Sequence, residues 1–324
     1  MPRSLRVEYP GAVYHVLNRG NYRDSVFSSD AVKLIFEKTL FSACERSNWI
    51  LYGFCILDNH YHLALETPEP NLSVGMQWLQ ATFANRFNHI VRSRGHVFQG
   101  RFKSLIVERD EYMGVLLDYI HLNPVRAGIV ASDQLQAYRW SSFWYLFHKR
   151  KRPLFMNISS CLYYAGNLAD TPIGRKKYKS YLDFLAESNT EQENAKFKNL
   201  CRGWALGTKK FKSSLLERKQ IRWIESVGRE TEEARNLYWE SLLKRLLTYH
   251  GKSRSNIFSE KKSATWKVMI AYYMKKNTLV SNSWLGEHLY MGRPQGVSQY
   301  VGDFVKSKGF KTSQYKRMAG RINT

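Results

Sequence analysis

The sequence predicts an α+β fold, in which a ferredoxin-like antiparallel sheet of the split βαβ type carries helices on one face and is followed by a mainly helical C-terminal region. Over the first 108 residues the hydrophobic periodicity changes in the order strand, helix, strand, strand, helix, strand. Two apolar runs are separated only by Asp58 and Asn59, as in a hairpin. After HKRKRP at 148–153 the composition becomes rich in Lys, Tyr and Asn, which marks the end of a first domain.

Each expected element has a local signal. Residues 11–20 alternate in polarity and predict a strand. The Ser and Asp residues at 28–30 can cap the first helix, and Gly95 ends the second. The helix that starts at Asp110 is expected to stop at Asn123, because the next residue is a proline, which disfavours helical geometry in the residue before it. In chain order we expect a strand over 11–20, a helix over 30–46, strands over 49–57 and 60–67, a helix over 72–93, a strand over 96–108 and a helix from Asp110 to about Leu122.

We expect three regions: a first domain over 1–150, a helical connecting region over 151–250, and a helix-turn-helix-like DNA-binding domain over 251–324. From 264 onward three short helical segments are joined tightly around the turn YMGRP, an order typical of helix-turn-helix domains. An ordinary small helical bundle shows the same pattern, but the 14 basic and 3 acidic residues of 251–324 favour DNA binding. The candidate DNA contacts at the start of the recognition helix are Arg293, Gln295, Ser298 and Gln299.

The net charge indicates a polyanionic partner. The chain has 50 Lys and Arg against 27 Asp and Glu, which gives +23. Residues 1–150 carry a net charge of +4 and residues 151–324 carry +19, so we expect the second half to supply most of the non-specific affinity for DNA. Charge alone would also suit a ribosomal partner or an anionic membrane surface.

Composition also bounds the location. The N-terminus lacks the apolar stretch of a signal peptide, and the apolar runs are shorter than the roughly 20 residues that span a bilayer. The four cysteines form no CxxC pair, so neither a disulfide framework nor a cysteine-ligated zinc site is indicated. We expect a soluble, cytoplasmic, nucleoid-associated protein with no membrane partner.

Two short patterns could carry chemistry. His60 and His62 are two apart on a predicted strand, so both imidazoles point to one face and could bind the same metal ion. Tyr119 and Asn123 are four apart on a predicted helix, which places a phenol beside an amide oxygen. A tyrosine can act as a covalent nucleophile while a metal ion stabilises charge on a phosphoryl group. Separately, the histidines also fit a polar sheet edge, and the tyrosine fits a packing role between helix and sheet.

These two patterns occur together with four further segments: YHVLNRGNYRDSVF (14–27), HVFQGRFKS (96–104), YIHLNPVRAGIV (119–130) and YRWSS (138–142). In combination they resemble the HUH single-strand transposases, and within them the REP-associated tyrosine transposases, which are named after repetitive extragenic palindromes. The resemblance covers about residues 1–150. It implies that His60, His62 and Asn123 bind Mg²⁺ or Mn²⁺. It also implies that Tyr119 becomes linked to a 5′ phosphate when the enzyme nicks and rejoins single-stranded DNA at hairpins. Tyr61 stands where family members often carry a smaller apolar residue, and strand alternation turns it away from the metal.

Several polar residues of 1–150 are candidate DNA contacts, since Arg and Lys bind phosphates and Gln can read adenine. These residues are Arg19, Arg23, Gln99, Arg101 and Lys103. The expected partners are single-stranded and hairpin DNA, and the protein would act as a monomer or a homodimer. Two other functions fit: a non-catalytic DNA-binding regulator that keeps the fold as a platform, and an HUH nickase of plasmid or phage replication.

Overall fold

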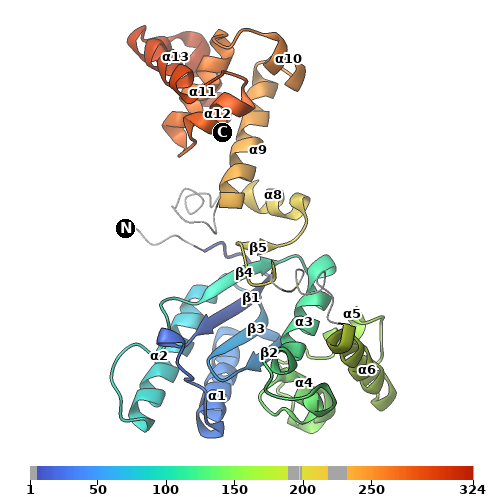
Figure 1. The fold of residues 1–324 in the computed structure, drawn as a ribbon. Coiled ribbons are helices and arrows are strands. Elements are labelled where there is room, and N and C mark those ends of the chain that lie inside the picture. The colour runs from blue at the N-terminus through green and yellow to red at the C-terminus, as the bar shows by residue number, and fades with distance from the viewer. Residues whose placement is uncertain (1–5, 189–196, 198, 218–231, 324) are drawn as a thin grey trace. The chain divides into compact units, whose positions relative to one another are not determined.

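The computed structural model describes residues 6–188, 197, 199–217 and 232–323. The chain divides into two compact units, of which the first contains Leu5–Lys212 and the second contains Ser213–Thr324 (Figure 1). The first unit therefore continues past residue 150 and includes a large part of the region expected to connect two domains.

A mixed sheet forms the centre of the first unit. Its strand order is β2-β3-β1-β4-β5, and all neighbours are antiparallel except β4 and β5. The first four strands have the order of the predicted split βαβ arrangement, so the fold class is confirmed. The strand expected over 96–108 is shorter, because residues before 103 form only an isolated bridge to Gly20. The strands are β1 Ala12–Arg19, β2 Ile50–Ile56, β3 His60–Thr67, β4 Lys103–Val107 and β5 Ala205–Leu206.

The helices α1 (Asp30–Ser47) and α2 (Leu72–Ile90) pack together on one face of the sheet (Figure 1). The first begins where the Ser29 hydroxyl accepts a hydrogen bond from the backbone of the first turn, one of the caps that the sequence offered. The core between these helices and the sheet is aromatic: the rings of Phe36 and Tyr61 lie 4.6 Å apart, and Phe36 and Phe83 lie 5.1 Å apart. Both helices of the predicted split βαβ unit are therefore on one face.

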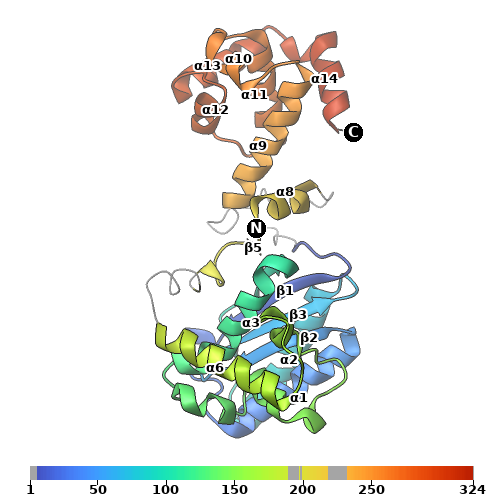
Figure 2. The ribbon, with the colours of Figure 1, turned by 90° about the vertical axis from the view of Figure 1, so that its right-hand side faces the viewer.

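The opposite face carries α3 (Arg109–Arg126), as Figures 1 and 2 show. The helix does not stop at Asn123 as expected but continues through Pro124 and ends at Arg126. The backbone N–H groups of 127 and 129 bond to the carbonyls of Asn123 and Pro124, each at 2.9 Å, and Gly128 takes a left-handed φ of 68°. These bonds close the last turn and make the proline tolerable so near the helix end. Asn123 consequently keeps its helical position relative to residue 119.

Smaller helices complete the first unit, and η2, α5 and α6 contact α3. They are η1 Asn21–Arg23, η2 Ser132–Ala137, α4 Ser142–Phe147, η3 Lys149–Lys151, α5 Ser160–Tyr164 and α6 Pro172–Ser188. The chain then returns to the sheet, where β5 pairs in parallel with β4 at its edge. Residues near 200 are thereby brought to the face that α3 covers.

The second unit is helical. Its core includes buried residues of α9 as well as of the later helices, so the core begins before residue 251. Gly286 lies close to the turn after α12: a Cβ there would sit 2.4 Å from the carbonyl oxygen of Gly292, which itself has a φ of 87°. The elements are α8 Lys209–Glu217, which crosses the boundary of the units, then α9 Glu232–Tyr249, α10 Arg254–Ser259, α11 Thr265–Asn277, α12 Asn282–His288, α13 Pro294–Lys306, η6 Gly309–Lys311 and α14 Ser313–Asn323.

Positive charge is distributed over both units. Residues 5–212 hold 28 basic and 18 acidic side chains, and residues 213–324 hold 21 and 9, so the net charges are +10 and +12. When the chain is divided at the observed boundary, the second unit thus carries about half of the excess. In the part of the chain that the structure describes, every helix is too short or too polar to cross a membrane.

Candidate metal and nucleophile site

His60 and His62 lie on the same face of β3, as the alternation predicts. Their ring centroids are 5.0 Å apart; His62 is buried, while His60 is half-buried at the end of the strand. Tyr61 points to the other face, where its ring packs against Phe36 and its hydroxyl lies 3.1 Å from the Gln80 amide nitrogen. The two imidazoles are thus separated from the Tyr61 phenol by the sheet itself.

The helix α3 brings Tyr119 to the histidine face. The ring centroids of Tyr119 and His62 are 5.3 Å apart and their planes are nearly perpendicular. Asn123, one helical turn further on, is buried, and its Nδ2 has no hydrogen-bond partner among the described residues. The structure therefore brings together all four residues that the two sequence patterns singled out.

Two further residues belong to this site and were not singled out from the sequence. His15 of β1 stacks on His62 at a centroid distance of 5.1 Å, with its Nε2 2.9 Å from the Nδ1 of His62. The Cys201 Sγ lies 3.1 Å from the Tyr119 hydroxyl. The predicted alternation of residues 11–20 could have placed His15 near the site, but no local pattern indicated Cys201.

Burial controls the ionisation of these groups. It lowers the pKa of His60 to about 4, with a smaller contribution from the positive charge of Arg19. It also lowers the pKa of His62 well below its usual value, and the neighbouring His15, His60 and Arg19 add to the effect. Both imidazoles are therefore neutral near pH 7, the form that binds metal ions.

The Tyr119 phenol is also neutral. Burial raises its pKa far above the ordinary value, and the Cys201 side chain raises it further. The Asn123 amide and the positive charge of Arg126 act in the opposite direction but are weaker. In this conformation the phenol keeps its proton, and a protonated phenol is a poor nucleophile.

The donor set fits a divalent metal ion. The His62 Nε2 is buried and has no hydrogen-bond partner in the described part of the chain, which is what a ligand atom without its metal looks like. His60 and Asn123 can supply a second nitrogen and an amide oxygen. Possible ligand atoms of His15, His62 and Cys201 also lie within 4.8 Å of one another. In that second set, however, both nitrogens of His15 and the Cys201 sulfur already have hydrogen-bond partners.

The candidate DNA contacts of the first unit gather at one end of the sheet. Arg19 pairs with His60 across β1 and β3, and its carbonyl accepts a hydrogen bond from the backbone of Gln99 at 2.8 Å. Lys103 begins the neighbouring strand β4 and is half-buried, whereas Arg19 and Gln99 are exposed. The remaining two are also exposed: Arg23 is the last residue of η1, and Arg101 lies in the loop before β4. Cationic and amide side chains therefore surround the end of the sheet that carries His60.

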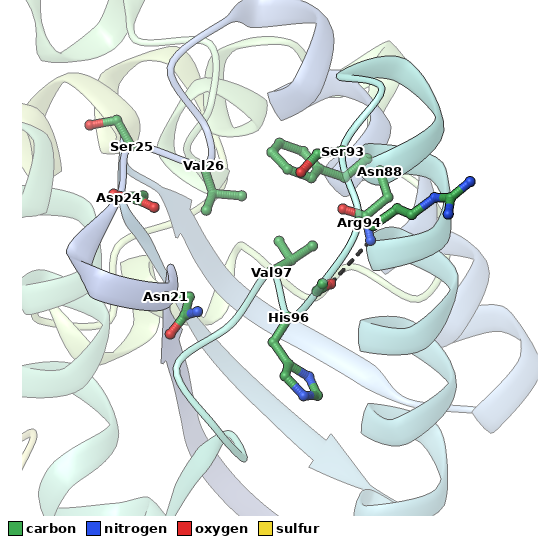
Figure 3. Close-up of a pocket in the computed structure, with 11 residues that line it drawn as sticks. Asn21, Asp24, Ser25, Val26, Asn88, Ser93, Arg94, His96 and Val97 are labelled. Carbon is green, nitrogen blue, oxygen red and sulfur yellow. Dashed lines mark hydrogen bonds between the residues drawn. The ribbon is translucent and has the colours of Figure 1, made fainter.

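A pocket of about 200 Å³ opens next to this end. In Figure 3, Asn21, Asp24 and Ser25 line one side and the segment around Asn88 and His96 lines the other. A hydrogen bond of 3.1 Å between the Asn88 amide and the carbonyl of residue 95 ties the second side together. The pocket reaches the end of α2 and so lies on the sheet face away from Tyr119. No sequence pattern had indicated it.

The four candidate contacts of the second unit are exposed: three lie on α13, and Arg293 is the N-cap residue just before it, while Val297 and Val301 of the helix are buried in the core. One side of α13 is therefore free to meet a ligand. The four residues are Arg293, Gln295, Ser298 and Gln299.

Comparison with known proteins shows what this part of the chain is similar to. Residues 9–123 match the family model described as IS200-like transposase. A curated protein of Haemophilus influenzae, whose provisional name is REP-associated tyrosine transposase, is 28% identical over 120 residues; the match covers 33% of this chain and 66% of that protein, just under two thirds of its length. A solved structure of a REP-associated tyrosine transposase bound to a REP hairpin aligns with a TM-score of 0.38 and 18% identity, over 47% of this chain and 89% of that one.

The matched segment contains His60, His62, Tyr119 and Asn123, and the resemblance expected from the sequence is confirmed. Residues 9–123 of this chain are therefore similar to the IS200-like transposases, and the chain resembles a REP-associated tyrosine transposase.

Proposed function

We propose that the first unit is a metal-dependent endonuclease and strand transferase that nicks and rejoins single-stranded DNA at hairpins of repetitive extragenic palindromes. Tyr119 is the nucleophile, and His60, His62 and Asn123 are the ligands of a Mg²⁺ or Mn²⁺ ion. The observation that carries the proposal is the contact between the Tyr119 ring and His62, which unites the two sequence patterns on one sheet face.

The reaction exchanges one ester bond for another. The Tyr119 oxygen forms a bond to the phosphorus, the bond from phosphorus to the 3′ oxygen breaks, the phenol loses its proton, and the leaving 3′ oxygen gains one. The products are a 5′ phosphotyrosine and a free 3′ hydroxyl. A second 3′ hydroxyl can reverse the step, and no ATP is needed because the number of ester bonds is unchanged. A bound divalent ion would supply charge stabilisation at the phosphoryl oxygens.

The DNA partners are single-stranded and hairpin DNA. Support comes from the cluster of Arg19, Gln99 and Lys103 beside His60, since a strand that reaches Tyr119 would pass this end of the sheet. Arg23 and Arg101 extend the same surface. The solved REP-associated tyrosine transposase is bound to a REP hairpin, and we propose the same class of ligand for the present chain. We also propose a cytoplasmic, nucleoid-associated protein that acts as a monomer or a homodimer.

The second unit is proposed to bind duplex DNA. The exposed side of α13 carries Gln295 and Gln299, which can donate and accept hydrogen bonds at base edges, and Arg293 is exposed at the start of the helix. Its net charge of +12 supplies sequence-independent attraction to phosphates. Residues 251–324 would then form the helix-turn-helix-like part, with α9 from the expected connecting region completing its core.

A cleavage assay tests the function. Labelled single-stranded DNA with an imperfect hairpin from intergenic repeats is incubated with the protein and Mg²⁺ or Mn²⁺, and the products are separated on a denaturing gel. We expect cleaved DNA in the wild type, none in His60→Ala or His62→Ala, and nearly unchanged hairpin binding in both variants. Wild-type cleavage by His62→Ala would contradict the metal assignment.

Two outcomes would favour another function. Hairpin binding without cleavage under any metal condition would indicate a non-catalytic regulator. Strand-specific nicking without joining of two ends would indicate a nickase of the replication type.

A further inference from the structure

A chain of hydrogen bonds runs from the backbone near residue 200 to the candidate metal site. The Leu200 carbonyl oxygen lies 2.8 Å from the Nδ1 of His15, and the Nε2 of His15 lies 2.9 Å from the Nδ1 of His62. His15 and His62 are 0% and 1% exposed, so both rings are shielded from bulk solvent. This series of hydrogen bonds ends at the His62 Nε2, which has no hydrogen-bond partner among the described residues.

The donor and acceptor roles in this series of hydrogen bonds follow from the Leu200 carbonyl at its start. A carbonyl oxygen can only accept, so the Nδ1 of His15 must carry a proton and donate it. The Nε2 of a neutral His15 is then an acceptor, and the Nδ1 of His62 must donate to it. With its one proton on Nδ1, His62 has a lone pair on Nε2, which is the atom left without a partner.

We infer that His15 is a positioning residue that fixes His62 in the form required of a metal ligand, in which the Nε2 lone pair would be available to the ion. The inference rests on the proposed function, since it concerns the same metal site. A ligand histidine commonly donates its other ring N–H to a neighbouring group, which fixes the orientation of the ring and increases its basicity. Here a second histidine takes that place and is itself held by the Leu200 carbonyl.

The inference also gives the segment around Leu200 a role. This segment lies outside residues 9–123 that match the family model, and it reaches the site because β5 pairs with β4. Cys201 of the same segment contacts the Tyr119 hydroxyl. Residues that follow Tyr119 by about 80 positions in the sequence thus complete the surroundings of His62 and Tyr119.

Manganese binding tests the inference without measuring activity. The free Mn²⁺ signal in electron paramagnetic resonance is titrated with the wild type, His15→Phe, His15→Gln and Tyr61→Phe, and with His62→Ala as the baseline for binding elsewhere. Phe keeps a ring of similar size but loses both hydrogen bonds, and we expect a 10- to 100-fold weaker site, the usual effect of removing such a partner. Gln can still accept from His62 and should recover most of the affinity. Tyr61→Phe, a matched change on the opposite sheet face, should bind like the wild type.

Equal affinity of the wild type and His15→Phe would overturn the inference while leaving the metal site intact. No difference between the wild type and His62→Ala would instead refute the metal site of the proposed function, and the inference with it.

Nitrogen NMR of the wild type, labelled at its histidine rings, gives a second test that depends on no variant being folded. We expect His62 without metal to be protonated on Nδ1 and unprotonated on Nε2, and His15 to show the same form. A proton on the His62 Nε2 would overturn the inference.

Discussion

His121 offers a quantitative test of how α3 is held. Its ring is fully buried, with Nδ1 2.9 Å from the Tyr178 hydroxyl and Nε2 3.0 Å from the Ser142 hydroxyl. The Tyr178 hydroxyl donates to Asp118 at 2.9 Å, so it must accept from His121 Nδ1, and Ser142 must donate to His121 Nε2. A neutral His121 is therefore fully satisfied, and burial lowers its pKa to about 3.

The magnitude follows from proton linkage. Between pH 6.5 and about 3 the unfolded chain binds a proton at residue 121 and the folded chain does not. This contribution is fully present above pH 6.5, and it is lost at about 1.4 kcal/mol per pH unit as the pH falls, or about 5 kcal/mol over the whole interval.

Hydrogen exchange of α3 peptides measures the effect. Between about pH 4.5 and 7, with intrinsic exchange corrected, the free energy of opening in the wild type should fall more steeply toward low pH than in His121→Gln, which has no titrating ring. The difference in slope should be about 1.4 kcal/mol per pH unit below about pH 5.5 and should approach zero near pH 7. His89→Gln, which changes an exposed histidine of α2, is the control and should follow the wild type. Equal slopes for the wild type and His121→Gln would refute the reasoning.

Three further predictions concern activity and binding. Tyr119→Phe and Tyr61→Phe each remove one hydrogen bond of a buried or half-buried hydroxyl, so in thermal unfolding both variants should lose about 1 kcal/mol of the free energy of unfolding. Only Tyr119→Phe should lose DNA cleavage, and equal activity of the two variants would contradict our assignment. Cys201→Ala removes a group that raises the Tyr119 pKa and should speed single-turnover cleavage by up to about 10-fold, whereas a slower rate would show that the thiol assists. Removing residues 213–324 takes away a net charge of +12 and should weaken DNA binding and flatten its salt dependence, and equal salt slopes would argue against this. This cut keeps the core of the second unit in one piece, whereas removing only 251–324 would split it.

The sequence was sufficient for features set by local periodicity. Strand alternation placed His60 and His62 on one face and Tyr61 on the other, and helical spacing placed Tyr119 beside Asn123. The order of strands and helices predicted the sheet topology because short connections leave few ways to pair four strands.

Features that depend on distant contacts were not predictable. The strand β5 has two residues and too little sequence to show a period, and Cys201 reaches Tyr119 only because of that pairing. The predicted end of α3 was also wrong, because the hydrogen bonds that close its last turn outweigh the preference of the residue before Pro124 for a non-helical conformation. The boundary of the first unit lies in helical sequence with no compositional break, so only the packing reveals it.

The most direct test of the central claim is to map the covalent link between protein and DNA. The adduct formed on hairpin DNA with Mn²⁺ is digested with a protease and a nuclease, and the peptide that carries the nucleotide is sequenced by mass spectrometry. We predict that the modified residue is Tyr119, which lies on the histidine face of the sheet. A nucleotide on Tyr61, or cleavage of DNA without any protein-linked product, would contradict the account.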